Sequence, residues 1–240
     1  MTDIADNLKI VLDSIRRAER LSGRGENSVH LLAVSKFHSV QDVLEAASAG
    51  VLAFGENRVQ EAAAKFSEVK KIYPNVKLHI IGQLQMNKVK KAVEIADCIE
   101  SVDRLELIAE IEKQAAKIDK TLPVLLELHT GEDSKSGFPD TDALENALTH
   151  IASGGAPHVI PAGFMTMAPF TDDEKRIRTS FSSLRHAKER LAALFPHFRL
   201  ETLSMGMTGD YKIAIEEGST QVRIGTAIFG ERDYANGVLQ

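Results

Sequence analysis

Lys36 is the residue of this sequence best suited to covalent chemistry, because it directly follows a short apolar run. The run covers residues 29–35 and is rich in Leu and Val, which is typical of a buried strand. Partial burial at the end of such a strand lowers the pKa of a lysine amine, and a neutral amine can form a Schiff base with an aldehyde or ketone. The alternative is a lysine that only marks where the strand leaves the core, and Lys36 alone does not decide between the two.

A second candidate group lies near the carboxyl end of the chain and consists of small and hydroxyl residues. Ser204 ends the apolar run at 199–204, and the pair Gly225-Thr226 ends the run at 221–226. In α/β barrels the loops at this position often bind phosphate through backbone N–H groups. Ordinary tight loops use the same residue types, so this pattern by itself is not specific.

Arg223 is a third candidate, since it lies two residues before Gly225 and points to the same side of its strand. If that side is the interior of a barrel, the guanidinium can pair with a carboxylate such as that of Glu127. It can also face a ring nitrogen of a bound cofactor, which would then stay unprotonated because arginine is always charged. The spacing leaves both roles open.

These residues need a frame that brings several strand ends together, and the rest of the chain predicts one. Eight short apolar runs alternate with helical patterns, at residues 29–35, 51–55, 77–82, 98–102, 123–129, 159–165, 199–204 and 221–226. The helical patterns begin near Ser39, Glu56, Asn87, Asp103, Asp140, Asp172 and Asp210. Regular alternation of this kind indicates parallel strands with right-handed crossovers.

We therefore expect an α/β protein with a single-domain (β/α)8 barrel of the TIM type over residues 1–240. An amphipathic pattern between Ile4 and Leu21 adds a helix at the amino terminus. Ser39 and Asp103 are expected as helix N-caps, and residues 171–174 as a capping box. Closure of the barrel would make the last strand a neighbour of the first, so that Gly225 and Lys36 come close together.

Composition excludes several classes of function. The net charge of −5 argues against a general nucleic-acid or acidic-membrane binder, and no apolar stretch has the length of a membrane span. The lone Cys98 allows neither an internal disulfide nor a paired-cysteine zinc site, and no metal site is expected. The amino terminus lacks the pattern of a signal peptide, so we expect a cytoplasmic protein. No interface signature is present, which leaves a monomer or a weak dimer.

One motif imitates a nucleotide-binding loop and is rejected. Residues 131–137 contain glycines and Lys135, but they lack the spacing of a P-loop. A solvated loop is expected there, and whether Lys135 reaches an anionic ligand stays open.

Several short segments, taken in order, resemble the family of pyridoxal-phosphate homeostasis proteins, also called the YggS or PROSC family. They are Ala33-Val-Ser-Lys36, Phe54-Gly-Glu-Asn-Arg-Val-Gln-Glu61, His79-Ile-Ile-Gly-Gln-Leu-Gln-Met-Asn-Lys88, Ser134-Lys-Ser-Gly137, Gly163-Phe-Met-Thr166, Leu203-Ser-Met-Gly-Met-Thr208, Val222-Arg-Ile-Gly-Thr226 and Phe229-Gly230. They extend from residue 33 to residue 230 and fall one by one on the expected barrel segments, so together they are far more specific than any single motif.

The resemblance implies a barrel similar to the cofactor domain of bacterial alanine racemases, with pyridoxal 5'-phosphate (PLP) as its cofactor. It implies that Lys36 holds PLP as an internal aldimine and that Arg223 faces the pyridine nitrogen. It further implies eight cofactor-binding residues in all: Lys36, Asn57, His79, Ser204, Met207, Arg223, Gly225 and Thr226. Of these, Ser204, Gly225 and Thr226 would hold the phosphate, and Asn57, His79 and Met207 would line the remaining pocket.

The family points to a protein that holds its cofactor rather than one that turns over a substrate, and no catalytic residue is expected. A two-base racemase needs a second acid or base, and this chain offers only Tyr73, Tyr211 and Tyr234 as tyrosines. An unprotonated pyridine is also a weaker electron sink. We expect a regulator that buffers or delivers PLP, with PLP-dependent apo-enzymes as candidate recipients. The alternatives are a PLP-dependent amino-acid racemase and a cofactor-free aldolase that uses Lys36.

Overall fold

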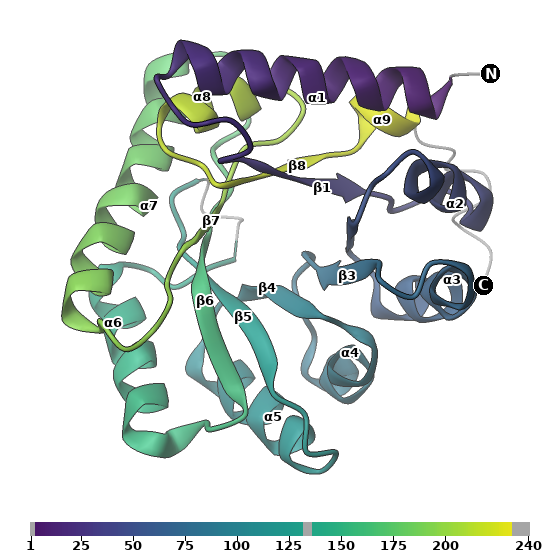
Figure 1. Cartoon of the computed structure of the whole chain (residues 1–240). Coiled ribbons are helices and arrows are strands. Elements are labelled where there is room, and N and C mark those ends of the chain that lie inside the picture. The colour runs from purple at the N-terminus through teal and green to yellow at the C-terminus, as the bar shows by residue number, and fades with distance from the viewer. Residues whose placement is uncertain (1–2, 132–135, 232–240) are drawn as a thin grey trace.

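The computed structural model describes residues 3–131 and 136–231, and within them eight parallel strands close into a barrel (Figure 1). The strands are β1 (His30–Val34), β2 (Ala53–Glu56), β3 (Lys77–Ile80), β4 (Cys98–Val102), β5 (Leu122–Glu127), β6 (Val159–Met165), β7 (Thr202–Ser204) and β8 (Gln221–Ile224). Each strand pairs with the next one in the chain, and β8 pairs with β1. The predicted (β/α)8 barrel is confirmed.

Helices surround the barrel on its outer side (Figure 1). They are α1 (Ile4–Leu21), α2 (Val40–Ser48), α3 (Val59–Ile72), α4 (Val89–Ile95), α5 (Leu105–Ala116), α6 (Thr141–His150), α7 (Glu174–Leu194), α8 (Tyr211–Glu216) and α9 (Thr226–Phe229), with short turns η1 (Met86–Lys88) and η2 (Ile151–Gly155). The predicted amino-terminal helix is confirmed as α1, which lies against α8 and α9. No helix among the described residues has the length and apolar character needed to cross a membrane.

Helix starts follow the local capping chemistry, and this corrects one prediction. At α2 the expected N-cap Ser39 is confirmed, and because Ser39 accepts from the Asp42 N–H while Asp42 accepts from the Ser39 N–H, the two residues form a capping box. The capping box expected at 171–174 is wrong. The N-cap of α7 is Asp173, whose carboxylate accepts the first N–H groups of the helix, while the Thr171 hydroxyl accepts from the Asp173 N–H.

Two further helix starts lie later than expected. Asp103 is not an N-cap, because its carboxylate pairs with the Arg104 guanidinium and Arg104 itself stands at the N-cap position of α5. Helix α3 begins at Val59 rather than near Glu56, because Glu56 still belongs to β2. In both places a polar residue that suits a helix start has a partner elsewhere.

At the ends of β1 and β2, alternate residues face either the surrounding helices or the interior of the barrel. Phe54 points outward and packs against Phe66 of α3, with ring centroids 5.9 Å apart. Two residues later Glu56 lies on the same outer side, where it accepts a hydrogen bond from Ser35. Lys36 follows Ser35 and faces the interior of the barrel. The alternation thus sends Lys36 to the mouth of the barrel and its neighbours Ser35 and Glu56 to the helix layer.

Candidate cofactor site at the barrel mouth

A cavity of about 650 Å³ opens at the carboxyl ends of the strands. Its wall includes the last residues of several strands and the loops that follow them. Six of the eight predicted site residues line it, namely Lys36, Asn57, Met207, Arg223, Gly225 and Thr226. They come from the ends of β1, β2, β7 and β8, which lie far apart in the sequence and meet only because the barrel closes.

Gly225 allows the close approach of β8 to β1. A Cβ at Gly225 would lie 2.9 Å from the Val34 carbonyl oxygen and 3.3 Å from the Val34 Cβ. Real Cβ atoms do not come that near to a backbone oxygen, so a larger residue would push the two strand ends apart. The glycine therefore brings the backbone of Gly225 and Thr226 next to the segment that carries Lys36.

Arg223 is buried beside the cavity and held by oxygen atoms of neighbouring strands. One terminal nitrogen, Nη1, donates to the Ser204 carbonyl at 2.6 Å and to the Ser204 hydroxyl at 2.8 Å, and Nη2 donates to the Thr166 carbonyl at 2.8 Å. The ion pair considered between Arg223 and Glu127 is not formed, since these oxygens take up the guanidinium instead. Burial lowers the pKa of Arg223, and the carboxylates of Glu100 and Glu127 oppose that shift.

Glu127 adds a carboxyl group to the cavity wall that the sequence did not single out as a site residue. It is 1% exposed, and the Ser136 hydroxyl lies 3.2 and 3.1 Å from its two oxygens. Burial raises the pKa of Glu127 to about 7, against the opposing effects of the Ser136 hydrogen bond and the Arg223 charge. The signal that could have found it is its place at the end of the fifth apolar run, on the side that faces inward.

Ser204 and His79 do not line the cavity. They lie in a layer beneath it, around the fully buried carboxylate of Glu100. Ser204 Oγ donates to Glu100 Oε2 at 2.6 Å, His79 Nδ1 lies 2.6 Å from Oε1, and Gln221 Nε2 donates to Oε1 at 2.8 Å. In this arrangement the Ser204 hydroxyl bonds to both Arg223 and Glu100. Its predicted contact with a phosphate stays a prediction.

The loop after β7 supplies the residues that take that place at the wall. Thr208, Gly209 and Asp210 line the cavity next to Met207. Asp210 Oδ1 accepts the Met207 N–H at 2.6 Å and closes the turn, which presents the Thr208 side of the loop to the cavity. Met207 was the predicted site residue of this loop, and its neighbours were not predicted, although Thr208 is the last residue of one of the family segments.

A cluster of metal-ligand types also occurs in the layer beneath the cavity. One donor atom each of His79, Cys98 and Glu100 lies within 4.8 Å of the others. His79 and Glu100 already bond to each other, and burial raises the pKa of the Cys98 thiol well above its usual value, which disfavours the thiolate that binds metals. We describe the cluster as a hydrogen-bonded core group.

The tyrosines weighed as possible acid–base groups lie elsewhere. The Tyr211 hydroxyl donates to Ser14 Oγ of α1 at 2.7 Å, and Tyr73 caps the carboxyl end of α3. Tyr234 and Lys135 fall outside the described residues. Among the described residues of the cavity wall, Glu127 is the buried carboxyl group that could act as an acid or base.

Comparison with known proteins agrees with this geometry. The family model described as alanine racemase, N-terminal domain, matches residues 7–233. A curated relative from Vibrio alginolyticus, called pyridoxal phosphate homeostasis protein, is 40% identical over 238 residues, which covers 98% of this chain and 100% of the relative. Both matches extend over nearly the whole chain and so include all eight strands and the loops at the barrel mouth.

Solved structures give the same result. PipY of Synechococcus elongatus, in a structure described with PLP bound, is 34% identical with a TM-score of 0.81, covering 95% of this chain and 100% of that chain. Alanine racemase from Corynebacterium glutamicum shares the fold, with a TM-score of 0.64 at 17% identity, covering 94% of this chain but 59% of that chain. The chain therefore belongs to the alanine racemase N-terminal domain family and, within it, to the pyridoxal phosphate homeostasis proteins.

Proposed function

We propose that this protein binds PLP in the barrel-mouth cavity, retains it through Lys36, and buffers or delivers it in the cytoplasm without turning over a substrate. The observation that carries the proposal is the convergence of Lys36, Arg223, Gly225 and Thr226 on one cavity. The names of the relatives and the PLP-bound PipY structure support the choice of ligand.

The residues present fit this cofactor by their chemistry. PLP supplies an aldehyde with which a lysine amine condenses, and Lys36 is the partly buried amine of the wall. Arg223, held in place by Ser204 and Thr166, presents a fixed positive charge that keeps a facing pyridine nitrogen unprotonated. Gly225 and Thr226 offer backbone and hydroxyl donors for a phosphate, with Thr208 as a further hydroxyl.

The proposal of a carrier rather than an enzyme rests on what surrounds the cavity. Tyr211 is engaged with α1 rather than the cavity. Glu127 is the observation that favours a second candidate function, a weak amino-acid racemase, because a buried acid with a pKa of about 7 can exchange protons near neutral pH.

A visible-range spectrum of the purified protein tests the proposal. We expect an absorption band at wavelengths longer than those at which protein alone absorbs. A carbonyl-trapping amine should remove the band, and Lys36→Ala should lack it although the variant folds like wild type. A colourless protein that cannot be loaded with PLP would contradict the proposal and favour the alternative function of a cofactor-free aldolase. Uptake of solvent deuterium at Cα of a free amino acid, lost in Glu127→Gln, would establish the racemase.

Delivery is tested separately from binding. The loaded protein is mixed with a PLP-dependent apo-aminotransferase, either in one compartment or across a membrane permeable only to PLP. Activation that is faster in one compartment supports transfer by contact, and equal rates support release into solution. No activation in either case would restrict the role to buffering.

A further inference from the structure

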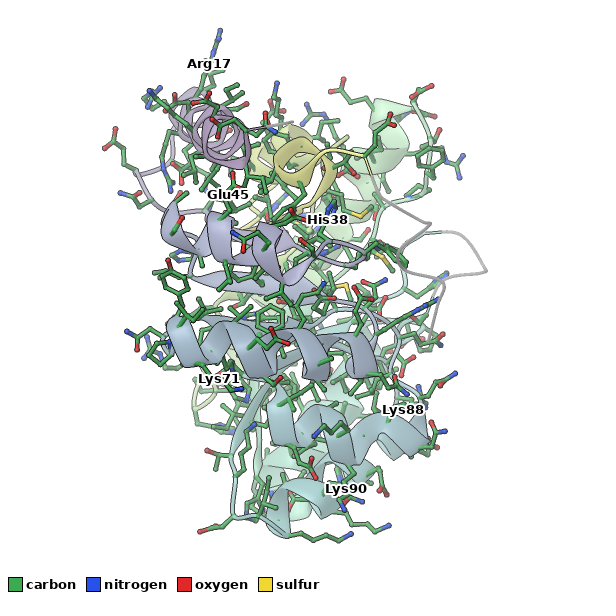
Figure 2. The ribbon with its side chains drawn as sticks, turned by 90° about the vertical axis from the view of Figure 1, so that its right-hand side faces the viewer. Arg17, His38, Glu45, Lys71, Lys88 and Lys90 are labelled. Atoms are coloured by element: carbon green, nitrogen blue, oxygen red, sulfur yellow. The ribbon has the colours of Figure 1, made fainter. Side chains whose placement is uncertain are left out.

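A buried cluster of charges lies behind Lys36, between the barrel and α3. Lys65 of α3 donates to Glu56 Oε1 at 2.8 Å and to Glu61 Oε1 at 3.0 Å. The side chains of Lys65 and Glu56 are 6% and 0% exposed, and that of Glu61 is 26% exposed. Figure 2 views this side of the molecule, with α2 (Glu45) and α3 (Lys71) side by side.

Such a cluster is costly to bury, so its contacts need an explanation. Burial raises the pKa of Glu56, and its second oxygen, Oε2, has no hydrogen-bond partner among the described residues. Apolar residues of similar size would often serve stability as well as a buried ion pair does. Stability alone therefore does not account for the presence of Lys65 and Glu56 here.

The contacts that the cluster makes with the backbone surround Lys36. Lys65 Nζ donates to the Ser35 carbonyl at 2.8 Å, which belongs to the peptide group entering Lys36. The Phe37 N–H, which belongs to the peptide group leaving Lys36, donates to Glu61 Oε1 at 2.8 Å. Both peptide groups of Lys36 are thus bonded to one cluster, which we call the lysine clamp (Glu56, Glu61 and Lys65).

The residue after Lys36 shows what the clamp holds. Phe37 has a φ of +66°, a left-handed conformation that a non-glycine residue rarely adopts. The bond to Glu61 compensates for that conformation, and the Arg58 guanidinium lies 5.6 Å from the centroid of the Phe37 ring. The turn sets the direction in which the chain leaves Lys36, and the bond from the Phe37 N–H to Glu61 fixes the peptide group on the carbonyl side of Lys36.

We propose that Glu61 and Lys65 are positioning residues, which hold the backbone of Lys36 so that its amine faces the cavity. Neither side chain lines the cavity, and both act through the peptide groups of Ser35 and Phe37 on either side of Lys36. The inference rests on the proposed function in one respect only, that PLP retention is its functional readout. The geometry of the clamp itself is a property of the protein without cofactor.

The test compares Glu61→Ala with Glu61→Gln, because the Gln side-chain oxygen still accepts the Phe37 N–H. The matched control is Lys70→Met on the same helix, which removes an ion pair to Asp97 of 2.7 Å far from Lys36. Lys65→Met is a harsher variant, since it leaves two carboxylates without their cation. Thermal unfolding of each protein without cofactor accompanies every measurement, so that loss of folding is seen directly.

We expect Glu61→Ala to weaken PLP retention by about tenfold or more, because a displaced amine reacts poorly. Glu61→Gln and Lys70→Met should stay close to wild type. Hydrogen exchange of the Phe37 amide in the cofactor-free protein should speed up in Glu61→Ala and not in Lys70→Met. The proposal would be overturned if Glu61→Ala retained PLP as well as wild type does. It would also be overturned if Lys70→Met lost PLP to the same extent as Glu61→Ala. If wild type binds no PLP, the proposed function fails, and unchanged Phe37 exchange then overturns the clamp independently.

Discussion

Two glutamates lie in the barrel interior at different depths, and their pKa values are shifted in opposite directions. Glu100 lies in the layer beneath the cavity, and although burial pushes its pKa up, the bonds from His79 and Ser204 and the nearby Arg223 charge bring it below the ordinary value. Glu127 lies at the mouth, where burial outweighs its few partners and raises the pKa to about 7. Both side chains are buried, so the number of donors decides the sign of the shift.

The comparison separates a supporting layer from a reactive one. Glu100 accepts hydrogen bonds from Ser204 and Gln221 and lies 2.6 Å from His79, so it is suited to hold these three side chains in place. At the mouth, Glu127 lies 3.2 and 3.1 Å from the Ser136 hydroxyl and lines the cavity together with Lys36 and Arg223. Four substitutions, from the largest expected effect to the smallest, can break or sharpen this distinction.

Glu100→Ala should have the largest effect on stability. The change removes the acceptor shared by three donors and leaves them buried, together with the Arg223 charge, without their partner. We expect a loss of about 3–5 kcal/mol in the free energy of unfolding. Urea unfolding of the cofactor-free protein measures it. A loss below about 1 kcal/mol would show that the layer is not the support described here.

Glu127→Gln should act through pH. The unfolded carboxyl titrates at 4.5 and the folded one at about 7, so the folded state holds an extra proton between these values. The contribution of this group to the free energy of unfolding is therefore fully present below pH 4.5 and is lost as the pH rises through 7. The total loss is up to about 3 kcal/mol. The variant should lack this slope and exceed wild type in stability above neutral pH. Equal slopes in denaturant unfolding across this range would contradict the assignment.

Gly225→Ala should disturb the mouth without disturbing the layer beneath it. The new Cβ would meet the Val34 carbonyl at 2.9 Å, and relief of that contact separates β8 from β1. We expect a loss of about 1–3 kcal/mol in stability, together with weaker PLP retention. Chemical denaturation and the visible spectrum measure the two effects. Unchanged retention would mean that the close approach at Gly225 does not matter for the site.

Lys36→Ala should have the smallest effect on folding and the greatest on ligand retention. Lys36 is partly buried at the mouth, so we expect the free energy of unfolding to change by less than about 1 kcal/mol. Covalent retention of PLP should be abolished. Denaturant unfolding beside the visible spectrum separates the two readouts. A large loss of stability would place Lys36 in the supporting layer instead.

Much of the fold was predictable because its signals are local. Amphipathic spacing predicted α1, and the alternation of short apolar runs with helical patterns predicted a closed barrel. Helix starts were less predictable where a suitable polar residue is engaged in an ion pair, as Asp103 is with the adjacent Arg104 and Glu56 is with Lys65 of α3. The runs at 98–102 and 159–165 coincide with β4 and β6, whereas β7 is only Thr202–Ser204 within the run at 199–204.

The site was predictable in part. Lys36, Asn57, Met207, Arg223, Gly225 and Thr226 come from strand ends, and strand ends of a parallel barrel converge whatever the details. Ser204 and His79 lie beneath the cavity rather than in its wall, because their depth depends on the register of β7 and β3 against their neighbours. Their part in cofactor binding stays a prediction. Thr208 and the lysine clamp were not predicted, and Glu127 was considered only as a partner for Arg223, because nothing in the local sequence marks which polar residues face each other.

By itself, the sequence determined the barrel, its order of strands and Lys36 as the amine at the mouth, because periodicity and residue type are properties of short segments. Only the tertiary structure decided which carboxyl is bonded and which stays poised near neutral pH, because burial and donor number come from strands distant in the chain. The same holds for Glu61 and Lys65, which reach both peptide groups of Lys36 only when α3 packs against β1 and β2.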